Sequence, residues 1–394
     1  MGNRNRNVGI VGVGQTVYSS HREDVSQPEL CNEAVQAALR DAGLGIDDVA
    51  CVVHGNMELF ELVHQPDCWH TLGTGAYGKE ALRVTTGGTT GATLACVADN
   101  LVASGLHEVV LAVGFEKLGE GHTTGGITNM ADPLWGRKLQ TGALSGAAAQ
   151  EMIAEFGAER AERVSMLYRI LMDQHAMRNP HAHRRLGLRF EQLEELRRTS
   201  PVLVGDLRMI HMCSQSDGAC AVIFASEERI RKLGRSAAWV RDHITVHREE
   251  TFTLFGDEPI ETTQRYAARK LFARNGIRDP RREIDVFEMY DPSSWWGVEW
   301  LRDFLLLAAD EHLRMVEQRE IAIDGSFPVN PSGGVIASNP IGATALVRVA
   351  EAANQVRKAA GQHQVPRHVR QAMASGFGGT FWTVLMLLTE EPPS

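Results

Sequence analysis

Two stretches of nearly the same small residues stand in the two halves of the chain. Gly91-Ala92-Thr93-Leu94 begins one run with helical spacing, and Gly342-Ala343-Thr344-Ala345-Leu346 begins another. Continuous apolar runs such as 109–113 flank them, which is typical of strands covered on both faces. The pattern predicts two similar α/β halves packed face to face, because two helices rich in Gly and Ala can approach closely at such a centre.

Length and charge narrow the class of protein. A chain of 394 residues predicts two domains or one large layered domain. The formal net charge of −9 argues against a nucleic-acid-binding protein. The sequence contains no apolar run of about 18 residues, which is the length that a membrane-spanning helix needs. The first residues have no signal-peptide pattern, so we expect a cytoplasmic protein with reduced thiols. Four cysteines have apolar neighbours and read as core residues: Cys31, Cys51, Cys96 and Cys220.

A turn rich in Thr and Gly precedes the first small-residue helix. In the stretch 84–93 an apolar approach ends in Thr85-Thr86-Gly87-Gly88-Thr89-Thr90. The first turn of such a helix carries free N–H groups that suit a carbonyl or oxyanion, and Thr89 and Thr90 are candidate caps. A tight βα turn without chemistry is the alternative. Because no Cys, Ser or His stands in the turn, catalysis there would use backbone and hydroxyl donors.

Other segments carry weaker signals. We expect a long loop over Phe115–Thr141, a length that is usually functional or covers a site. The stretch Asn179–Thr199 is polar and basic. It is either a segment that binds phosphate or a solvent-exposed helical excursion. A strand over Ile284–Tyr290 ends in Asp291-Pro292, and a Trp-rich helix follows.

Taken together, these landmarks resemble the thiolase superfamily, and within it the sterol-carrier-protein-type thiolase-like branch. The resemblance is carried by an ordered set of motifs: Val8–Gly14, Arg83–Gly91, Val102–Gly105, Val113–Lys117, Ser216–Ala219, Phe287–Pro292, Asn330–Gly334, Asn339–Thr344 and Gly376–Gly379. It implies a thiolase fold, with duplicated βαβαβ halves in a five-layered αβαβα core. It divides the chain at residues 1–245 and 246–394, with a loop and helix excursion at about 115–212 that covers the acyl-CoA site. It also implies a homodimer through the edge of the first-half sheet.

The residues that thiolases use for catalysis differ here. Where thiolases place a nucleophilic Cys, the alignment of the motifs puts Gly88. Tyr290 stands for one family His, and Ser338-Asn339-Pro340 matches a motif that carries a second. The last motif is Ser375-Gly376-Phe377-Gly378, without its Cys or His. A conventional acyl-enzyme needs a thiolate, which Gly88 lacks, and Cys96 lies two helical turns away on an apolar helix.

Within the family, the chain is close to the thiolase-like aldolases that lack the Cys. Their retro-aldol reaction on a 3-hydroxyacyl-CoA needs no covalent intermediate. We expect Tyr290 to be the general acid/base, with a lowered pKa or a proton relay, and Asn339 to hold the thioester oxygen with the N–H groups of the turn. Tyr290 has to lie within about 8 Å of Gly88 to share a substrate with it. The predicted substrate-binding residues are Gly87, Gly88, Thr89, Thr90, His54, Ser375 and Gly378.

Each assignment has a plainer alternative. Tyr290 also reads as a core tyrosine whose hydroxyl is hydrogen-bonded to a neighbour. Asn339 also reads as a turn residue before a proline. His54 also reads as a structural histidine. The tryptophans Trp295, Trp296 and Trp300 read as core or interface, and three histidines, His175, His181 and His183, show no readable metal-ligand geometry.

The resemblance also bears on ligands and partners. We expect no bound cofactor and no metal, with a coenzyme A thioester as substrate. Aldolases of this type work with a small OB-fold/zinc-ribbon protein, so the resemblance makes such a partner one possibility for this chain. A divergent acetyl-CoA acyltransferase and a non-catalytic acyl-CoA-binding scaffold remain the competing functions.

Overall fold

The fold is built on one mixed β-sheet that bends through two layers. The computed structural model describes residues 6–58, 67–121, 143–247, 261–378 and 382–393. Within them, nine strands are hydrogen-bonded in the order β3-β2-β4-β7-β1-β8-β11-β10-β9. Their bounds are β1 Val8–Gln15, β2 Cys51–Gly55, β3 Glu80–Arg83, β4 Val109–Lys117, β7 Asp217–Ser226, β8 Ala238–His247, β9 Val286–Glu288, β10 Gln371–Gly378 and β11 Trp382–Thr389.

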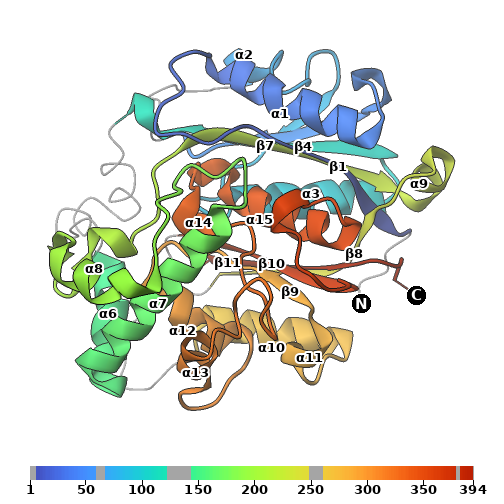
Figure 1. Cartoon of the computed structure of the whole chain (residues 1–394). Helices are drawn as coiled ribbons and strands as arrows, with labels where there is room; N and C mark the ends of the chain where they lie inside the picture. Colours follow the sequence, from blue (N-terminus) through green and yellow to red (C-terminus); the bar gives the residue numbers. More distant parts are fainter. Residues whose placement is uncertain (1–5, 59–66, 122–142, 248–260, 379–381, 394) are drawn as a thin grey trace.

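Helices cover both faces of the sheet and fill the space between its two layers (Figure 1). The outer layer on the N-terminal half holds α1 (Gln27–Ala42) and α2 (Asp67–His70). The central layer holds α3 (Thr90–Ala103) and α15 (Ile341–Arg357), which pack against each other and against β4 and β10. The outer layer of the C-terminal half holds α10 Thr263–Asn275, α11 Pro280–Glu283, α12 Ser294–Phe304 and α13 Glu311–Glu317. These layers confirm the predicted five-layered thiolase fold.

The two central helices approach closely because glycine stands where they cross. A Cβ atom added at Gly91 would lie 2.2 Å from the backbone nitrogen of Leu346. A Cβ atom at Gly376 on β10 would lie 2.8 Å from the Cβ of Ala92. The repeat that stands out in the sequence therefore marks the centre of the molecule, as predicted.

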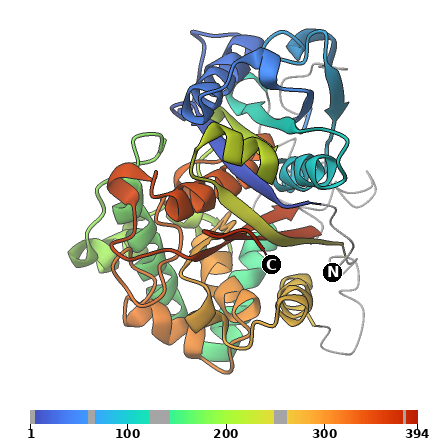
Figure 2. The same ribbon diagram turned by 90° about the vertical axis from the view of Figure 1, so that its right-hand side faces the viewer.

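Strand β8 joins the two halves. It pairs with β1 through Gly9↔Trp239 and Ile10↔Ala238, and along most of its length with β11. Figure 2 shows the blue and cyan N-terminal elements stacked above the orange and red C-terminal ones. The predicted boundary at residues 245 and 246 falls inside β8, and its position remains a prediction.

An excursion between β4 and β7 packs against the C-terminal half. It contains α6 (Ala143–Phe156), α7 (Ala158–Ala176), α8 (Leu193–Thr199) and the hairpin of β5 Val202–Val204 and β6 Leu207–Arg208. Helices α6 and α7 contact α12, and α7 also contacts α13 and α14 (Gly334–Ala337). The excursion thus brings side chains of the first half to the loops that follow β9. The remaining short helix, α9 (Glu227–Leu233), connects β7 to β8.

Local chemistry explains where elements begin and end. Helix α1 begins after a capping box, in which Ser26 and Glu29 satisfy each other's backbone N–H, and it ends at Gly43 with φ 68°. The predicted strand over Ile284–Tyr290 is shorter, because side chains take its last N–H groups: Met289 N–H donates to Asn330 Oδ1 at 2.5 Å.

The loop predicted over Phe115–Thr141 is wrong at its start. Phe115 and Lys117 lie in β4, which pairs as far as Asp217 on β7. Residues 122–141 of that prediction lie outside the described residues. Among the helices that are described, none has the length and apolar character needed to cross a membrane. The four cysteines predicted to lie in the core are all buried.

Candidate functional site

The turn before α3 is held together by its own threonines. Thr89 Oγ1 donates to Thr86 O at 2.6 Å, and Thr90 Oγ1 donates to Gly87 O at 2.6 Å. Thr90 Oγ1 also accepts from Thr86 N–H at 2.9 Å. The N-terminus of α3 has no side-chain cap, so the expectation that Thr89 and Thr90 cap it is wrong. Their hydroxyls instead cross-link the turn, and a cross-linked turn presents its backbone in a fixed geometry.

Gly88 lies between β10 and Tyr290. A Cβ atom added at Gly88 would lie 2.4 Å from the Phe377 carbonyl oxygen and 3.2 Å from the Tyr290 hydroxyl oxygen. A Cβ atom at Gly378 would lie 3.5 Å from Thr86 O and from the Thr89 methyl carbon. The structure therefore brings the turn, the Gly376–Gly378 segment and Tyr290 together, and Tyr290 is well within the distance that a shared substrate requires.

Tyr290 is held firmly, but its hydroxyl has no partner. Its backbone N–H donates to Ser375 Oγ at 2.9 Å, and its ring centroid lies 6.2 Å from that of Phe377. The residue is 4% exposed. Within the described part of the chain, no group hydrogen-bonds the Tyr290 hydroxyl. The Tyr290 hydroxyl is not among the buried polar atoms that lack a partner, so it is the accessible end of an otherwise buried side chain and is free to bind a ligand.

Of the two routes expected for Tyr290, a lowered pKa or a proton relay, the lowered pKa is not found. Burial raises the pKa well above the usual value for tyrosine, and the nearby Cys213 raises it further. The buried phenol is therefore neutral and donates a hydrogen bond. The charge of Arg348 lowers the pKa of Tyr290, but it does not reverse the effect of burial.

Asn339 lies two residues before the start of α15, and hydrogen bonds fix the position of its side-chain amide. Asn339 Oδ1 accepts from Thr344 Oγ1 at 2.9 Å, and its backbone N–H donates to Ser216 Oγ at 3.1 Å. Asn339 Nδ2 donates to Cys213 Sγ at 3.3 Å. One of the two Nδ2 hydrogens remains for a ligand. These contacts fix the orientation of the Asn339 amide. A residue that only forms a turn would not need such a fixed amide.

Cys213 is the site residue that our sequence analysis missed. It lies just before β7, is partly exposed, and its backbone N–H donates to Pro292 O at 3.0 Å. Burial of the thiol raises the pKa of Cys213 to about 11, against the opposing charge of Arg184. The sequence around it, Met212-Cys213-Ser214, gave no signal, because the contact with Asn339 joins residues 126 positions apart.

His54 is not brought together with these residues. Side chains two positions apart on a strand share a face, so His54 of β2 faces the same side as Val52. Val52 packs in a core cluster with Leu30 and Ala34 of α1, on the outer side of the sheet. Ser375, by contrast, contacts Tyr290 directly and supports its backbone.

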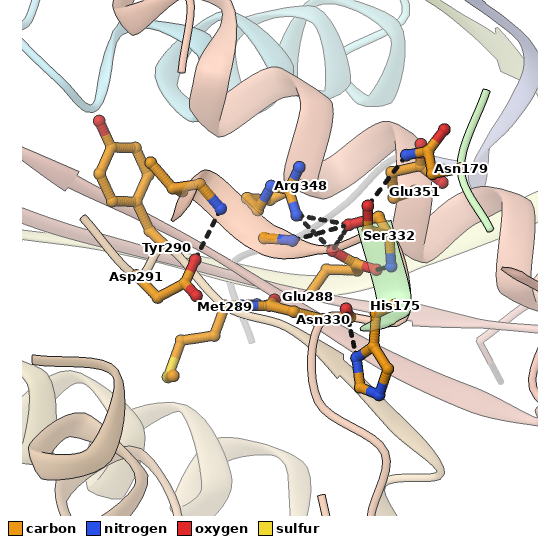
Figure 3. A network of polar contacts seen from close by, with 12 residues as sticks. His175, Asn179, Glu288, Met289, Tyr290, Asp291, Asn330, Ser332, Arg348 and Glu351 are labelled. Carbon is orange, nitrogen blue, oxygen red and sulfur yellow. Dashed lines mark hydrogen bonds and ion pairs between the residues drawn. The ribbon is translucent and has the colours of Figure 1, made fainter. Parts of the chain in front are cut away.

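Asp291 lies behind Tyr290 in a buried polar cluster (Figure 3). Asp291 Oδ2 accepts from the Tyr168 hydroxyl at 3.0 Å, and Oδ1 accepts from Val335 N–H at 2.6 Å. Burial raises the pKa of Asp291 to about 7. Gly334, at φ 72°, makes room for the carboxylate, since a Cβ atom there would lie 2.5 Å from Asp291 Oδ1. In Figure 3 the Tyr290 ring points away from this cluster, so Asp291 supports the site from behind.

A second buried cluster anchors β9 to α15. Arg348 Nη1 donates to Glu288 Oε2 at 2.5 Å and to Ser332 Oγ at 2.7 Å. Ser332 in turn donates from its hydroxyl to Glu288 Oε2 at 2.7 Å. Burial raises the pKa of Glu288 to about 7, although Arg348 opposes the shift. The cluster fixes the strand that positions Tyr290.

The predicted tryptophans and histidines have structural places. Trp296 and Trp300 stack at a centroid distance of 5.1 Å, and both contact the Phe377 ring beside Tyr290. His175 is tied on both ring nitrogens, to Asn330 O and Ile323 N–H, each at 3.0 Å. In the residues that the structure describes, no group of three or more His, Cys, Asp or Glu side chains has a metal-binding arrangement.

Comparison with known families covers most of the chain. The family described as "Thiolase, N-terminal domain" matches residues 8–185, and "Thiolase C-terminal domain-like" matches residues 245–391. An acetyl-CoA acetyltransferase of Methanothermobacter thermautotrophicus is 28% identical over 386 residues, which cover 95% of this chain and 97% of that protein. Sterol carrier protein 2 of Gallus gallus is 27% identical over 382 residues, covering 91% and 68% of the two chains.

Solved structures agree on the fold. The Ltp2-ChsH2(DUF35) aldolase superimposes with a TM-score of 0.81 at 22% identity, and 98% of each chain is covered. Human mitochondrial 3-ketoacyl-CoA thiolase superimposes with a TM-score of 0.70 at 16% identity, covering 98% of this chain and 99% of that one. By both family domains and by its fold, this chain belongs to the thiolase family.

Proposed function

We propose that the chain forms or cleaves a carbon–carbon bond in a 3-hydroxyacyl-CoA by aldol chemistry, without a covalent acyl intermediate. The observation that carries the proposal is the Tyr290 hydroxyl, which belongs to a buried side chain, has no hydrogen-bond partner in the described residues and lies 3.2 Å from the Cβ position of Gly88. Gly88 stands where thiolases place the nucleophilic Cys, and its surroundings leave no room for a side chain. The aldolase that superimposes over 98% of the chain supports the same class of reaction.

In this mechanism Tyr290 serves the β-oxygen of the substrate. In the direction of bond formation, the attack of a thioester enolate on a carbonyl leaves a β-alkoxide. A neutral phenol supplies the proton that this alkoxide needs, which fits the raised pKa of Tyr290. In the direction of cleavage the same oxygen takes the proton back.

The thioester oxygen carries the enolate charge and needs donors. The proposed donors are Asn339 Nδ2 and the backbone N–H groups of the turn. The Thr90 N–H is excluded from this set, because it donates to Gly87 O at 3.0 Å. The donors of the proposal are thus Gly88, Thr89 and Asn339, with Ser375 and Gly378 shaping the wall.

A divergent acyltransferase is the second candidate, favoured by the name of the methanogen relative. Cys213 is the thiol that such an enzyme would have to use. With a pKa of about 11, only a small fraction of Cys213 is thiolate at neutral pH, which makes it a weak nucleophile there. A non-catalytic acyl-CoA-binding scaffold is the third candidate, and the unpartnered Tyr290 hydroxyl argues against it.

We also propose a homodimer and a partner protein. Strand β3 is the edge of the sheet in the N-terminal half and its side chains are largely exposed, so it suits pairing with a second copy. The superimposed aldolase structure names a second component, ChsH2(DUF35), and we propose an OB-fold/zinc-ribbon protein in the corresponding role here. A cytoplasmic location remains a prediction.

One incubation separates the three functions. Purified chain, with and without an OB-fold/zinc-ribbon partner, is mixed with a set of 3-hydroxyacyl-CoA esters, and the carbonyl product is measured. Release of that product, lost in Tyr290→Phe, supports the aldolase. Cleavage of a 3-ketoacyl-CoA that depends on added CoA would instead identify an acyltransferase, and CoA-ester binding without either reaction would identify a scaffold.

A further inference from the structure

Two threonines occupy the same place in the two central helices but use their hydroxyls differently. Thr93 of α3 and Thr344 of α15 follow the same Gly-Ala pair of the internal repeat. Thr93 Oγ1 donates to Thr89 O at 3.2 Å, which is the usual bond of a threonine to the preceding turn of its own helix. Thr344 Oγ1 instead donates at 2.9 Å to Asn339 Oδ1, on a side chain outside the helix. The hydroxyl of Thr344 is therefore directed at a residue of the candidate site.

Among the described residues, the Thr344 hydroxyl hydrogen has one suitable acceptor, Asn339 Oδ1. Thr344 is 0% exposed, so its hydroxyl cannot turn to water. The carbonyl of the preceding turn, Pro340 O, already accepts the N–H groups of Ala343 at 2.7 Å and of Thr344 at 2.9 Å. If the Asn339 amide turned over, the hydroxyl hydrogen would have to compete for this occupied carbonyl. A buried donor without an acceptor is costly, so the Oδ1 end of the amide stays on Thr344.

The other contacts of Asn339 do not choose between the two ends of its amide. The backbone N–H of Asn339 donates to Ser216 Oγ at 3.1 Å, which fixes the main chain but leaves the amide free to turn over. Asn339 Nδ2 donates to Cys213 Sγ at 3.3 Å, but a thiol is both a weak donor and a weak acceptor, so either end of the amide suits it. Thr344 is thus the neighbour that decides which end of the amide faces a ligand.

The choice of end matters because only the Nδ2 end of the amide can bind the thioester oxygen. Nδ2 carries the hydrogens that this oxygen needs, whereas Oδ1 would repel the negative oxygen of the enolate. We propose, on the basis of the proposed function, that Thr344 is a positioning residue that keeps the donor end of Asn339 toward the thioester oxygen. Thr344 acts through Asn339 and not on the substrate itself. The arrangement selects thioesters, which have a carbonyl oxygen, over thioethers, which have none.

The test compares two ligands that differ only at the carbonyl. Acetyl-CoA carries it, and S-ethyl-CoA is the matched thioether with a CH₂ group in its place. Isothermal titration calorimetry on the purified chain measures both dissociation constants. We expect the wild-type chain to prefer acetyl-CoA by about 10-fold, the usual scale of a hydrogen bond to a carbonyl oxygen. Thr344→Val, which exchanges the hydroxyl for a methyl group, should lose most of this preference and keep the affinity for S-ethyl-CoA.

Further variants separate positioning from packing, because a packing defect alone would weaken the binding of both ligands equally. Asn339→Ala removes the donor itself and gives the preference that remains without it. Thr344→Ser keeps the hydroxyl and should keep the preference for acetyl-CoA. Thr344→Ala removes the hydroxyl without adding volume, so it should repeat the loss even if valine does not fit. Thr74→Val removes another buried hydroxyl, which donates to His70 O at 3.1 Å, and should leave the preference unchanged.

The outcomes distinguish this inference from the proposed function. An unchanged preference in Thr344→Val and Thr344→Ala, together with a lost preference in Asn339→Ala, overturns the role of Thr344. No preference in the wild-type chain overturns it as well, because Asn339 would then hold no carbonyl oxygen. A preference that depends on Thr344, without any cleavage of 3-hydroxyacyl-CoA esters, contradicts the proposed function and leaves the positioning role intact. Cleavage that is lost in Tyr290→Phe, alongside an unchanged preference in Thr344→Val, supports the proposed function and overturns only the role of Thr344.

Discussion

The hydroxyl oxygen of Tyr290 lies 3.2 Å from the position that a Cβ atom at Gly88 would occupy. The phenol therefore fills the space where a side chain on the turn would project. A side chain at position 88 is excluded mainly by the Phe377 carbonyl oxygen at 2.4 Å, and the Tyr290 hydroxyl adds a second tight contact, so the backbone and the phenol together leave this position to glycine.

Gly88→Ala tests this exclusion. The new Cβ atom meets the Phe377 carbonyl at 2.4 Å, and backbone cannot move aside as a flexible side chain can. We expect a loss of about 1–3 kcal/mol in the free energy of unfolding, as for overpacked cores, together with loss of activity. Urea denaturation measures the first quantity. Gly45→Ala is the matched control, because its Cβ would meet only Asp48 Oδ2 at 3.8 Å; equal stability of the two variants would contradict the crowding at Gly88.

Loss of the hydroxyl should change the free energy of unfolding by different amounts at two buried tyrosines, Tyr290 and Tyr168. The Tyr290 hydroxyl has no partner in the described residues, so Tyr290→Phe breaks no bond and should change the free energy of unfolding by less than about 0.5 kcal/mol. The Tyr168 hydroxyl donates to Asp291 and accepts from Asn330, so Tyr168→Phe leaves a buried carboxylate short of a donor and should cost about 1–3 kcal/mol.

The loss of activity should be larger in Tyr290→Phe than in Tyr168→Phe, which is the reverse of their order by loss of stability. Tyr290→Phe removes the proposed proton donor and should lower the aldol rate by about 10²- to 10⁴-fold. Tyr168→Phe keeps the phenol at the site and should retain more of the rate. Parallel thermal unfolding and product assays give both rankings, and a Tyr290→Phe protein that is as unstable as Tyr168→Phe would show that its hydroxyl has a structural bond.

The sequence predicted the frame of the molecule because the frame follows from local patterns. Gly91 and Gly342 begin the two central helices where expected, and the apolar runs became buried strands. The ordered motifs also indicated Gly88 and Tyr290, which the fold brings together.

What the sequence did not predict depends on tertiary contacts. The contact of Cys213 with Asn339 joins two distant segments, and no local pattern marks it. The face on which His54 lies depends on the register of β2, and a shift of one residue would have reversed it. A lowered pKa was one of the two routes expected for Tyr290, and it is not found because burial outweighs the nearby charges. Burial is a property of the whole fold, and the proton relay remains a prediction.

The pH dependence of stability should report Asp291. Its pKa is about 7 in the folded chain and near 3.8 when unfolded, so the folded state binds the extra proton between those values. The stabilising contribution is fully present below about pH 4 and is lost as the pH rises through 7, by up to about 1.4 kcal/mol per pH unit. Asp291→Asn removes this slope, and it should narrow the difference in unfolding free energy between pH 5 and pH 8.

A matched control variant tests whether the change in pH dependence is specific to Asp291. Asp285 also accepts backbone hydrogen bonds, from Arg370 and Gln371, but it lies outside the Asp291 cluster, so Asp285→Asn is the control for replacing a hydrogen-bonded carboxylate by an amide. Urea unfolding at pH 5, 6, 7 and 8 supplies the curves. An Asp291→Asn chain with the wild-type slope would place the titration on another group, such as Glu288.

Removal of the Arg348 guanidinium should be the most damaging single change near the site. Arg348 is 1% exposed and faces Glu288 at 2.5 Å, so Arg348→Met leaves a buried carboxylate without its cation and should cost about 3–5 kcal/mol. Glu288→Gln in the same chain removes the stranded charge, and the double variant should recover a large part of the loss. A double-mutant cycle by urea unfolding measures the coupling, and additive losses would mean that Arg348 stabilises the chain mainly through Ser332 rather than through the ion pair.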